Sequence, residues 1–151
     1  WSGKRSMRGY QKMDGPEYET PCKVDFITGA TLLIKAKTIE EIGLLDTTYF
    51  TYTEDIDWCY RATKAGFNIL YVPTAKVWHK ISMSTGGEMS PTSLYYISRN
   101  SLLFMKKHAK IHQQITYMTF SGLIFLRRFL LSDPKGKKAL IKGLIWHLKR
   151  E

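Results

Sequence analysis

Short apolar runs bounded by glycine and proline occupy the first part of the chain. They predict strands over residues 24–36, 67–72 and 75–81, and Gly29 interrupts the first of these. The pattern therefore predicts a domain that contains a sheet.

Capping signals and helical periodicity predict five helices. Residues 38–41 have capping-box spacing, and Gly43 is expected to end this short first helix. Thr53 is the expected N-cap of the second helix, over residues 54–65. The last three are expected over residues 90–108, 115–131 and 136–149. This order of elements is typical of half of an α/β domain followed by a helical appendage.

Composition limits what the chain can be. Its 151 residues suffice for one domain with a hydrophobic core. It begins at Trp1 without an initiator methionine or a signal peptide, so we expect a piece of a longer protein. Cys22 and Cys59 lack CxxC spacing, which argues against a zinc site and a disulfide framework and fits a reducing compartment.

The first turn of the second predicted helix carries three carboxylates: Glu54, Asp55 and Asp57. Acidic residues there are stabilised by the helix macrodipole, so a structural role is one interpretation. A site that holds a base and a metal ion is the other, because Gly29 and His79 lie at predicted strand ends. Asp57 and Arg61 also have the i,i+4 spacing of a salt bridge.

An ordered set of motifs carries a resemblance to a known family. The motifs occupy residues 29–34, 42–46, 49–61, 65–67, 71–73, 77–79, 95–96, 99–100 and 103–104. In this order they resemble the second half of family 2 inverting glycosyltransferases, most of all the bacterial rhamnosyltransferase-type members that build surface polysaccharides. The resemblance is close over about residues 24–108 and looser in the basic tail.

The resemblance implies a fold and a catalytic residue. The fold is α/β, with the acceptor-side half of a GT-A type nucleotide-sugar transferase domain in residues 1–108 and a basic amphipathic helical tail in residues 109–151. The family's acid pair makes Asp55 the catalytic base, with Glu54 beside it. Such a base takes the proton of an acceptor hydroxyl as this attacks the anomeric carbon and the nucleotide diphosphate leaves.

Metal binding is expected to involve His79. The resemblance makes it a ligand to a divalent cation, Mg²⁺ or Mn²⁺, that carries the donor diphosphate. A capped or packed histidine next to Trp78 is the alternative. Asp55 and Asp57 spell the DxD of metal-dependent glycosyltransferases, but no long buried strand precedes them. We therefore expect the donor-binding DxD, and most of the cation site, in an N-terminal half that this chain lacks.

Five further residues are candidates for substrate contacts. Gly29 and Ala30 would let the backbone approach the sugar or the acceptor, although a strand bulge is equally compatible with them. Arg61 could contact the diphosphate, or form the salt bridge within its own helix. Arg99 and Asn100 are candidates for the phosphate of a lipid-linked acceptor.

Charge is concentrated at the C-terminal end. Residues 1–100 have a net charge of +1 and residues 101–151 one of +9. Arg127 and Arg128 interrupt an apolar run of about 12 residues, well short of the ~20 needed to cross a bilayer. Residues 115–150 are instead suited to an anionic membrane surface, which predicts a cytoplasmic protein peripheral on the inner face of the plasma membrane. A helical hairpin packed on the catalytic domain is the alternative.

Two other functions compete with sugar transfer. The basic tail could belong to a binding module for membrane or nucleic acid, but no nucleic-acid-binding motif accompanies it, so nucleic acid is not an expected partner. The second competing interpretation is a degenerate domain that keeps the fold without activity. The expected partners are a nucleotide-sugar donor and a saccharide or lipid-linked acceptor. Because the nucleotide-binding strands are missing, we expect the chain alone to be inactive and its unpaired apolar edges to favour homo-oligomers.

Overall fold

The computed structural model describes residues 8–79 and 85–148. These residues form two compact units. We call residues 8–50 and 54–79 the mixed unit, and residues 51–53 and 85–148 the helical unit. Each unit is described by itself.

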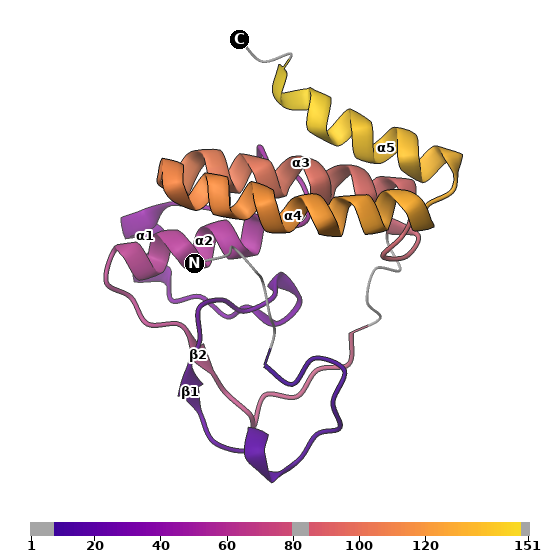
Figure 1. Cartoon of the computed structure of the whole chain (residues 1–151). Helices are drawn as coiled ribbons and strands as arrows, with labels where there is room; N and C mark the ends of the chain where they lie inside the picture. The colour runs from indigo at the N-terminus through magenta and orange to yellow at the C-terminus, as the bar shows by residue number, and fades with distance from the viewer. Residues whose placement is uncertain (1–7, 80–84, 149–151) are drawn as a thin grey trace. The chain divides into compact units, whose positions relative to one another are not determined.

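The mixed unit contains one small sheet and two helices (Figure 1). Strand β1 (Cys22–Lys23) pairs antiparallel with β2 (Leu70–Tyr71), with Cys22 opposite Tyr71. Helix α1 (Ala36–Ile42) precedes α2 (Glu54–Lys64) in the chain. Because the sheet contains only two residue pairs, the core of this unit is built on a helix and not on the sheet.

The core of the mixed unit forms around α2. Ala62 lies on the same face of the helix as Trp58 and Cys59 because it follows them by four and three residues, and all three are buried. Ile69 completes the buried cluster, and partly buried apolar side chains from both sides of α2 in the chain pack against it: Val24, Phe26, Ile27, Leu32, Ile34, Ile39, Ile42 and Phe67. The Trp58 Nε1–H donates to the Gly43 carbonyl at 2.9 Å, which ties α2 to the end of α1.

The strand predicted over residues 24–36 is wrong. Residues 24–35 contain a 3-10 turn (Gly29–Thr31) and otherwise irregular backbone. Their apolar side chains pack individually onto α2, so burial explains the apolar run without a ladder. The strand over residues 75–81 is also wrong for residues 75–79, and residues 80–81 lie outside the described part. Residues 70–71 are the part of the run at 67–72 that is a strand.

Helix predictions in the mixed unit are largely confirmed. Helix α1 ends where Gly43 adopts a φ of 79°, a conformation that glycine reaches without strain. The capping box at residues 38–41 is wrong, because α1 begins at Ala36 with Lys35 as its N-cap. Helix α2 has the predicted start and ends one residue earlier than predicted.

The helical unit consists of α3 (Pro91–His108), α4 (Ile111–Leu131) and α5 (Pro134–Ile145), followed by a 3-10 turn (Trp146–Leu148). The predicted start of α3 is confirmed, because the Ser90 side chain accepts a hydrogen bond from the Ser93 N–H and Pro91 opens the helix. The equivalent signal at Asp133 and Pro134 starts α5 two residues before the predicted position 136, and α4 starts four residues before the predicted position 115.

Helices α3 and α5 pack closely because α5 presents small residues. Gly136, Ala139 and Gly143 are buried along it. A Cβ at Gly143 would lie 2.6 Å from the Tyr95 carbonyl oxygen and collide with the Ser98 side chain, so this contact requires glycine. Helix α3 lies before the predicted boundary at residue 108 and α5 lies after it, and the two helices belong to one compact unit.

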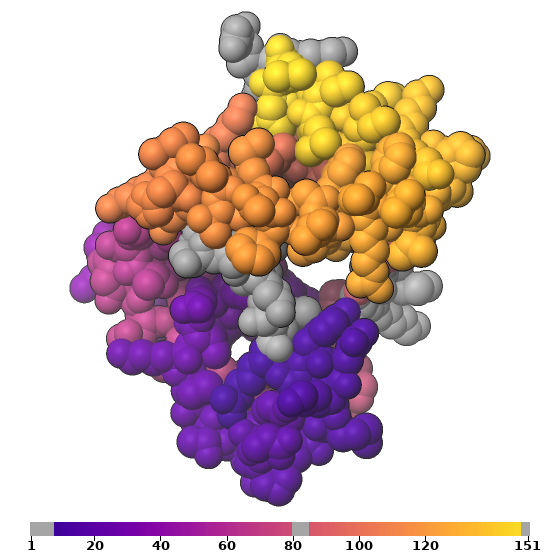
Figure 2. Space-filling view, in the orientation of Figure 1, coloured from indigo at the N-terminus to yellow at the C-terminus, as the bar shows by residue number. Residues whose placement is uncertain are grey.

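Helix α4 differs from its neighbours because it has no buried residue. Nine large apolar side chains are exposed along it: Ile111, Ile115, Met118, Phe120, Leu123, Ile124, Leu126, Leu130 and Leu131. In Figure 2 side chains of this segment, in orange, lie on the surface of the face shown. Over residues 8–79 and 85–148, none of the helices has the length and apolar character needed to span a membrane.

Candidate active site

Residues with left-handed backbone lead into the acid cluster. Phe50, Tyr52 and Thr53 have φ values of 64°, 60° and 84°. Thr53 is β-branched, and such residues rarely adopt positive φ. It therefore lacks the extended backbone that is typical of an N-cap, although α2 begins at Glu54, directly after it. The acid cluster follows a loop that needs support from elsewhere.

Asp55 is half-buried and held by backbone amides. Its Oδ2 accepts a hydrogen bond from the Gly29 N–H at 2.9 Å, and its Oδ1 accepts one from the Ile56 N–H at 2.8 Å. Gly29 and Asp55, 26 residues apart, are thus brought together. Ala30 is exposed in the same 3-10 turn.

Glu54 is half-buried at the first position of α2. Its Oε2 is buried and has no hydrogen-bond partner among the residues that the structure describes. Burial raises the pKa of the Glu54 carboxyl, the negative charge of Asp55 adds to this, and a hydrogen bond with the backbone N–H of Glu54 opposes it. The first turn of α2 therefore carries a carboxyl group with increased proton affinity next to one oriented by amides.

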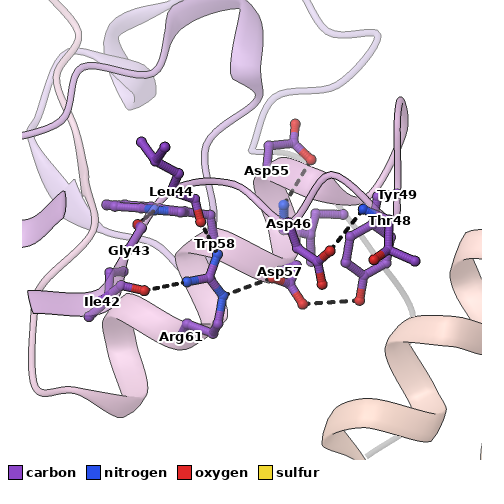
Figure 3. A network of polar contacts seen from close by, with 11 residues as sticks. Ile42, Gly43, Leu44, Asp46, Thr48, Tyr49, Asp55, Asp57, Trp58 and Arg61 are labelled. Atoms are coloured by element: carbon purple, nitrogen blue, oxygen red, sulfur yellow. Dashed lines mark hydrogen bonds and ion pairs between the residues drawn. The ribbon is translucent and has the colours of Figure 1, made fainter.

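Asp57 has a different environment from its two acidic neighbours. It is 1% exposed, accepts a hydrogen bond from the Tyr49 hydroxyl at 3.0 Å and pairs with Arg61 Nε at 2.9 Å. Burial, and then the charge of Asp57, raise the pKa of the Tyr49 phenol well above its usual range, so the phenol remains a donor. Figure 3 shows the carboxylates of Asp55 and Asp57 on different sides of α2.

Arg61 is the centre of a polar network that ties α2 to the end of α1. Besides Asp57, its guanidinium donates to the Ile42 carbonyl at 2.7 Å and to the Leu44 carbonyl at 2.8 Å (Figure 3). The predicted Asp57–Arg61 salt bridge is confirmed. Because Nε, Nη1 and Nη2 each have a protein acceptor, a diphosphate contact of Arg61 stays a prediction that these contacts do not favour.

His79 is exposed at the end of the first described stretch, and Trp78 beside it is 92% exposed. The alternative of a packed histidine is therefore wrong. Over residues 8–79 and 85–148, no group of three histidine, cysteine, aspartate or glutamate side chains is arranged to hold a metal ion. Metal ligation by His79 stays a prediction.

Arg99 and Asn100 lie in the helical unit, and both are buried there. The Arg99 Nε–H donates to Asn100 Oδ1 at 2.8 Å, and its guanidinium carbon lies 4.8 Å from the centre of the Trp146 ring. Asn100 Nδ2 donates to the carbonyls of Thr51 and Tyr52, both at 2.6 Å. Contact of this pair with an acceptor phosphate stays a prediction. Sequence reasoning missed the role of Asn100 in the loop, and no local pattern signals it.

Comparison with known proteins adds a family match. A family model described as "Glycosyltransferase like family 2" matches residues 8–99. This range includes the acid cluster and ends at Arg99, whereas α4 and α5 lie beyond it.

Several curated proteins are similar to the chain. An N-acetylglucosaminyl-diphospho-decaprenol L-rhamnosyltransferase of Mycobacterium tuberculosis is 29% identical over 108 residues, which cover 72% of this chain and 35% of the relative. A low-salt glycan biosynthesis hexosyltransferase of Haloferax volcanii is 30% identical over 102 residues, covering 67% and 33%. A rhamnosyltransferase of Escherichia coli is 36% identical over 56 residues, covering 37% and 21%. The chain thus spans about a third of the length of the Mycobacterium tuberculosis and Haloferax volcanii relatives. No solved structure matches the chain.

Proposed function

The chain belongs to glycosyltransferase-like family 2, and on that basis we propose that it is the acceptor-side part of an inverting, GT-A type glycosyltransferase. The complete protein would transfer a sugar from a nucleotide-sugar donor to a saccharide acceptor in surface polysaccharide synthesis. One observation carries the proposal: the matched region includes a carboxylate, Asp55, that two backbone amides hold at the start of a helix.

Asp55 is the proposed catalytic base. Its two hydrogen bonds use one lone pair on each oxygen, so a lone pair on each remains for an acceptor hydroxyl. As that hydroxyl attacks the anomeric carbon, the base takes its proton, and the nucleotide diphosphate leaves from the opposite face. The sugar's anomeric configuration is inverted in this single step. A carboxylate held in place avoids reorganisation when the proton moves.

Glu54 is proposed as the second acid of the site. Burial raises the pKa of its carboxyl towards neutral pH, and a pKa near the working pH suits a group that exchanges protons. Asp57 has no direct role in this proposal, because Tyr49 and Arg61 already satisfy its carboxylate. The cluster therefore divides into an outer pair for chemistry and an inner residue for structure.

A divalent cation, Mg²⁺ or Mn²⁺, is part of the proposal, and when bound it would neutralise charge on the leaving diphosphate. Its site would lie mainly outside this chain. The exposed imidazole of His79 could supply one ligand, but the described residues form no site by themselves.

The acceptor is proposed to be lipid-linked, which requires access to a membrane surface. The name of the mycobacterial relative contains a diphospho-decaprenol group. In this chain, the exposed apolar residues of α4 and the lysines of α5 are the proposed contact with the anionic inner face of the plasma membrane. The protein would then be cytoplasmic and peripheral.

Replacement of Asp55 in the full-length enzyme tests the proposal. Asp55→Asn keeps the shape of the side chain and removes its basicity, so we expect transfer to fall by ~10²–10⁴-fold while nucleotide binding persists. Asp25→Asn is the matched control, because Asp25 is an exposed aspartate of the same unit. Turnover by Asp55→Asn at the control's rate would refute the assigned base.

A further inference from the structure

The loop at residues 51–53 has a conformation that its sequence does not favour. Tyr52 and Thr53 have φ values of 60° and 84°, although neither is glycine, asparagine or aspartate. Backbone in this region persists only where surrounding contacts hold it. The next two residues in the chain are Glu54 and Asp55.

Asn100 supplies two of these contacts. Its side chain is fully buried, and both of its N–H bonds are used by the carbonyls of Thr51 and Tyr52. Its Oδ1 accepts from the Arg99 Nε–H, which fixes which end of the amide faces the loop. The amide is therefore oriented as a double donor to the loop backbone.

A second contact anchors the loop on the same face of α3. The Tyr52 hydroxyl lies 2.8 Å from Ser93 Oγ and 2.8 Å from Thr85 Oγ1. Ser93 and Asn100 are seven residues apart, two helical turns, so they line one face of the helix. One face of α3 thus holds both the backbone and the side chain of the loop.

We propose that Asn100 is a positioning residue for transfer, because it holds the left-handed loop whose next residues are the acid pair. This inference rests on the proposed function, since it assumes that Glu54 and Asp55 are catalytic. It differs from a phosphate contact, which would need the N–H bonds that the loop already uses. It also differs from a purely structural role, which would leave kcat unchanged in a folded variant.

Kinetics of the full-length enzyme test the proposal. We expect Asn100→Ala to lower kcat about 100-fold, the cost of displacing a catalytic group by about 1 Å. The donor KM should stay within about twofold, because substrate contacts are untouched. Ser98→Ala is the control, because it removes from the same helix a hydroxyl that donates to the Tyr95 carbonyl rather than to the loop.

A rescue experiment separates positioning from phosphate binding. Glycine adopts positive φ without strain, so Thr53→Gly should reduce the loop's need for Asn100. In the Asn100→Ala background we expect Thr53→Gly to raise kcat by about tenfold. A phosphate contact predicts instead a raised KM and no rescue, and either result would overturn the proposal.

Two further measurements keep the outcome decisive. Hydrogen exchange of the amides at residues 51–53 should quicken in Asn100→Ala and not in Ser98→Ala, a readout that is independent of catalysis. If Asn100→Ala does not fold, Tyr52→Phe loosens the same loop at its other anchor, and a kcat equal to wild type there would refute the proposal. An inactive Asp55→Asn with a fully active Asn100→Ala would reject this inference alone, whereas an active Asp55→Asn would reject the proposed function.

Discussion

Helix α2 buries four of its 11 residues, whereas α4 has 21 residues and buries none. Both helices carry apolar and charged side chains, so composition does not explain the difference. In α2 the apolar face meets residues of the same unit, and Asp57 pairs with Arg61 within the helix. In α4 nine large apolar side chains are exposed over most of its length.

This difference separates two ways in which a helix serves function. In α2, specific hydrogen bonds of Asp55, Asp57 and Arg61 give the acid cluster its geometry, so single substitutions should have large and distinct effects. The exposed face of α4 is suited to a contact over a broad area, to which each residue adds a small part. We therefore expect effects of different size and kind in the two helices.

Arg61→Ala should give the largest effect on stability. It leaves the Asp57 carboxylate, which is 1% exposed, without its cation, and it removes donors from two backbone carbonyls of the α1–α2 connection. Loss of one partner of a buried ion pair typically destabilises by ~3–5 kcal/mol, and we expect about 3 because Arg61 is 27% exposed. Urea unfolding followed by circular dichroism measures the change.

Lys76→Ala is the matched control for that measurement. It breaks the Lys76–Asp14 ion pair, whose N–O distance is 2.7 Å but whose side chains are 65% and 64% exposed. Solvent and salt screen such a pair, so we expect no change in the unfolding midpoint. Equal midpoints for Arg61→Ala and Lys76→Ala would contradict the view that burial makes the α2 network important.

Tyr49→Phe should have a smaller effect in the same network. It removes the hydroxyl that donates to Asp57 Oδ1 at 3.0 Å and preserves the fully buried ring. A hydrogen bond to a charged acceptor contributes ~1.5–3 kcal/mol, so we expect a loss of about 2 kcal/mol in the free energy of unfolding. A double-mutant cycle with Arg61→Ala measures the coupling, and strict additivity would show that Tyr49 and Arg61 act independently on Asp57.

Local features of both units were predicted better from the sequence than the strands of the mixed unit were. The Asp57–Arg61 pair and the starts of α2 and α3 depend on neighbours within four residues, and sequence rules describe such local interactions well. The strand at residues 24–36 was wrong because apolar content reports burial, and an irregular chain packed on α2 is buried as effectively as a strand.

The site itself was predictable only in part. The acid pair follows from local sequence and family motifs, but two contacts join residues that are far apart in the chain: the Gly29 amide with Asp55, and the Asn100 amide with residues 51–52. Almost every residue type has the same backbone N–H and C=O groups, so the sequence does not show which of them form long-range contacts. Only the three-dimensional structure identifies these contacts.

Substitutions on α4 should affect membrane binding and leave stability unchanged. Leu123 and Leu130 are 70% and 66% exposed, so replacing both with glutamine removes apolar area without opening a cavity. We expect binding to vesicles that contain anionic lipid to fall about tenfold, because binding scales with buried apolar area. Flotation with vesicles measures this, with the exposed Lys23→Gln of the mixed unit as control. Unchanged flotation would favour the alternative, a helical hairpin packed on the rest of the protein.

Glu54 should give the smallest effect, as a pH dependence of stability. Burial raises the pKa of its carboxyl in the folded chain above the ordinary value of 4.5, so between these two values the folded state binds more protons than the unfolded state. Its contribution is therefore complete below pH 4.5 and is lost as the pH rises through the folded-state pKa. Glu54→Gln, which cannot ionise, should be more stable than wild type at pH 7 and gain less at pH 4. Urea titrations at both values measure this, and an equal difference at the two pH values would show that the Glu54 carboxyl titrates as it does in the unfolded chain.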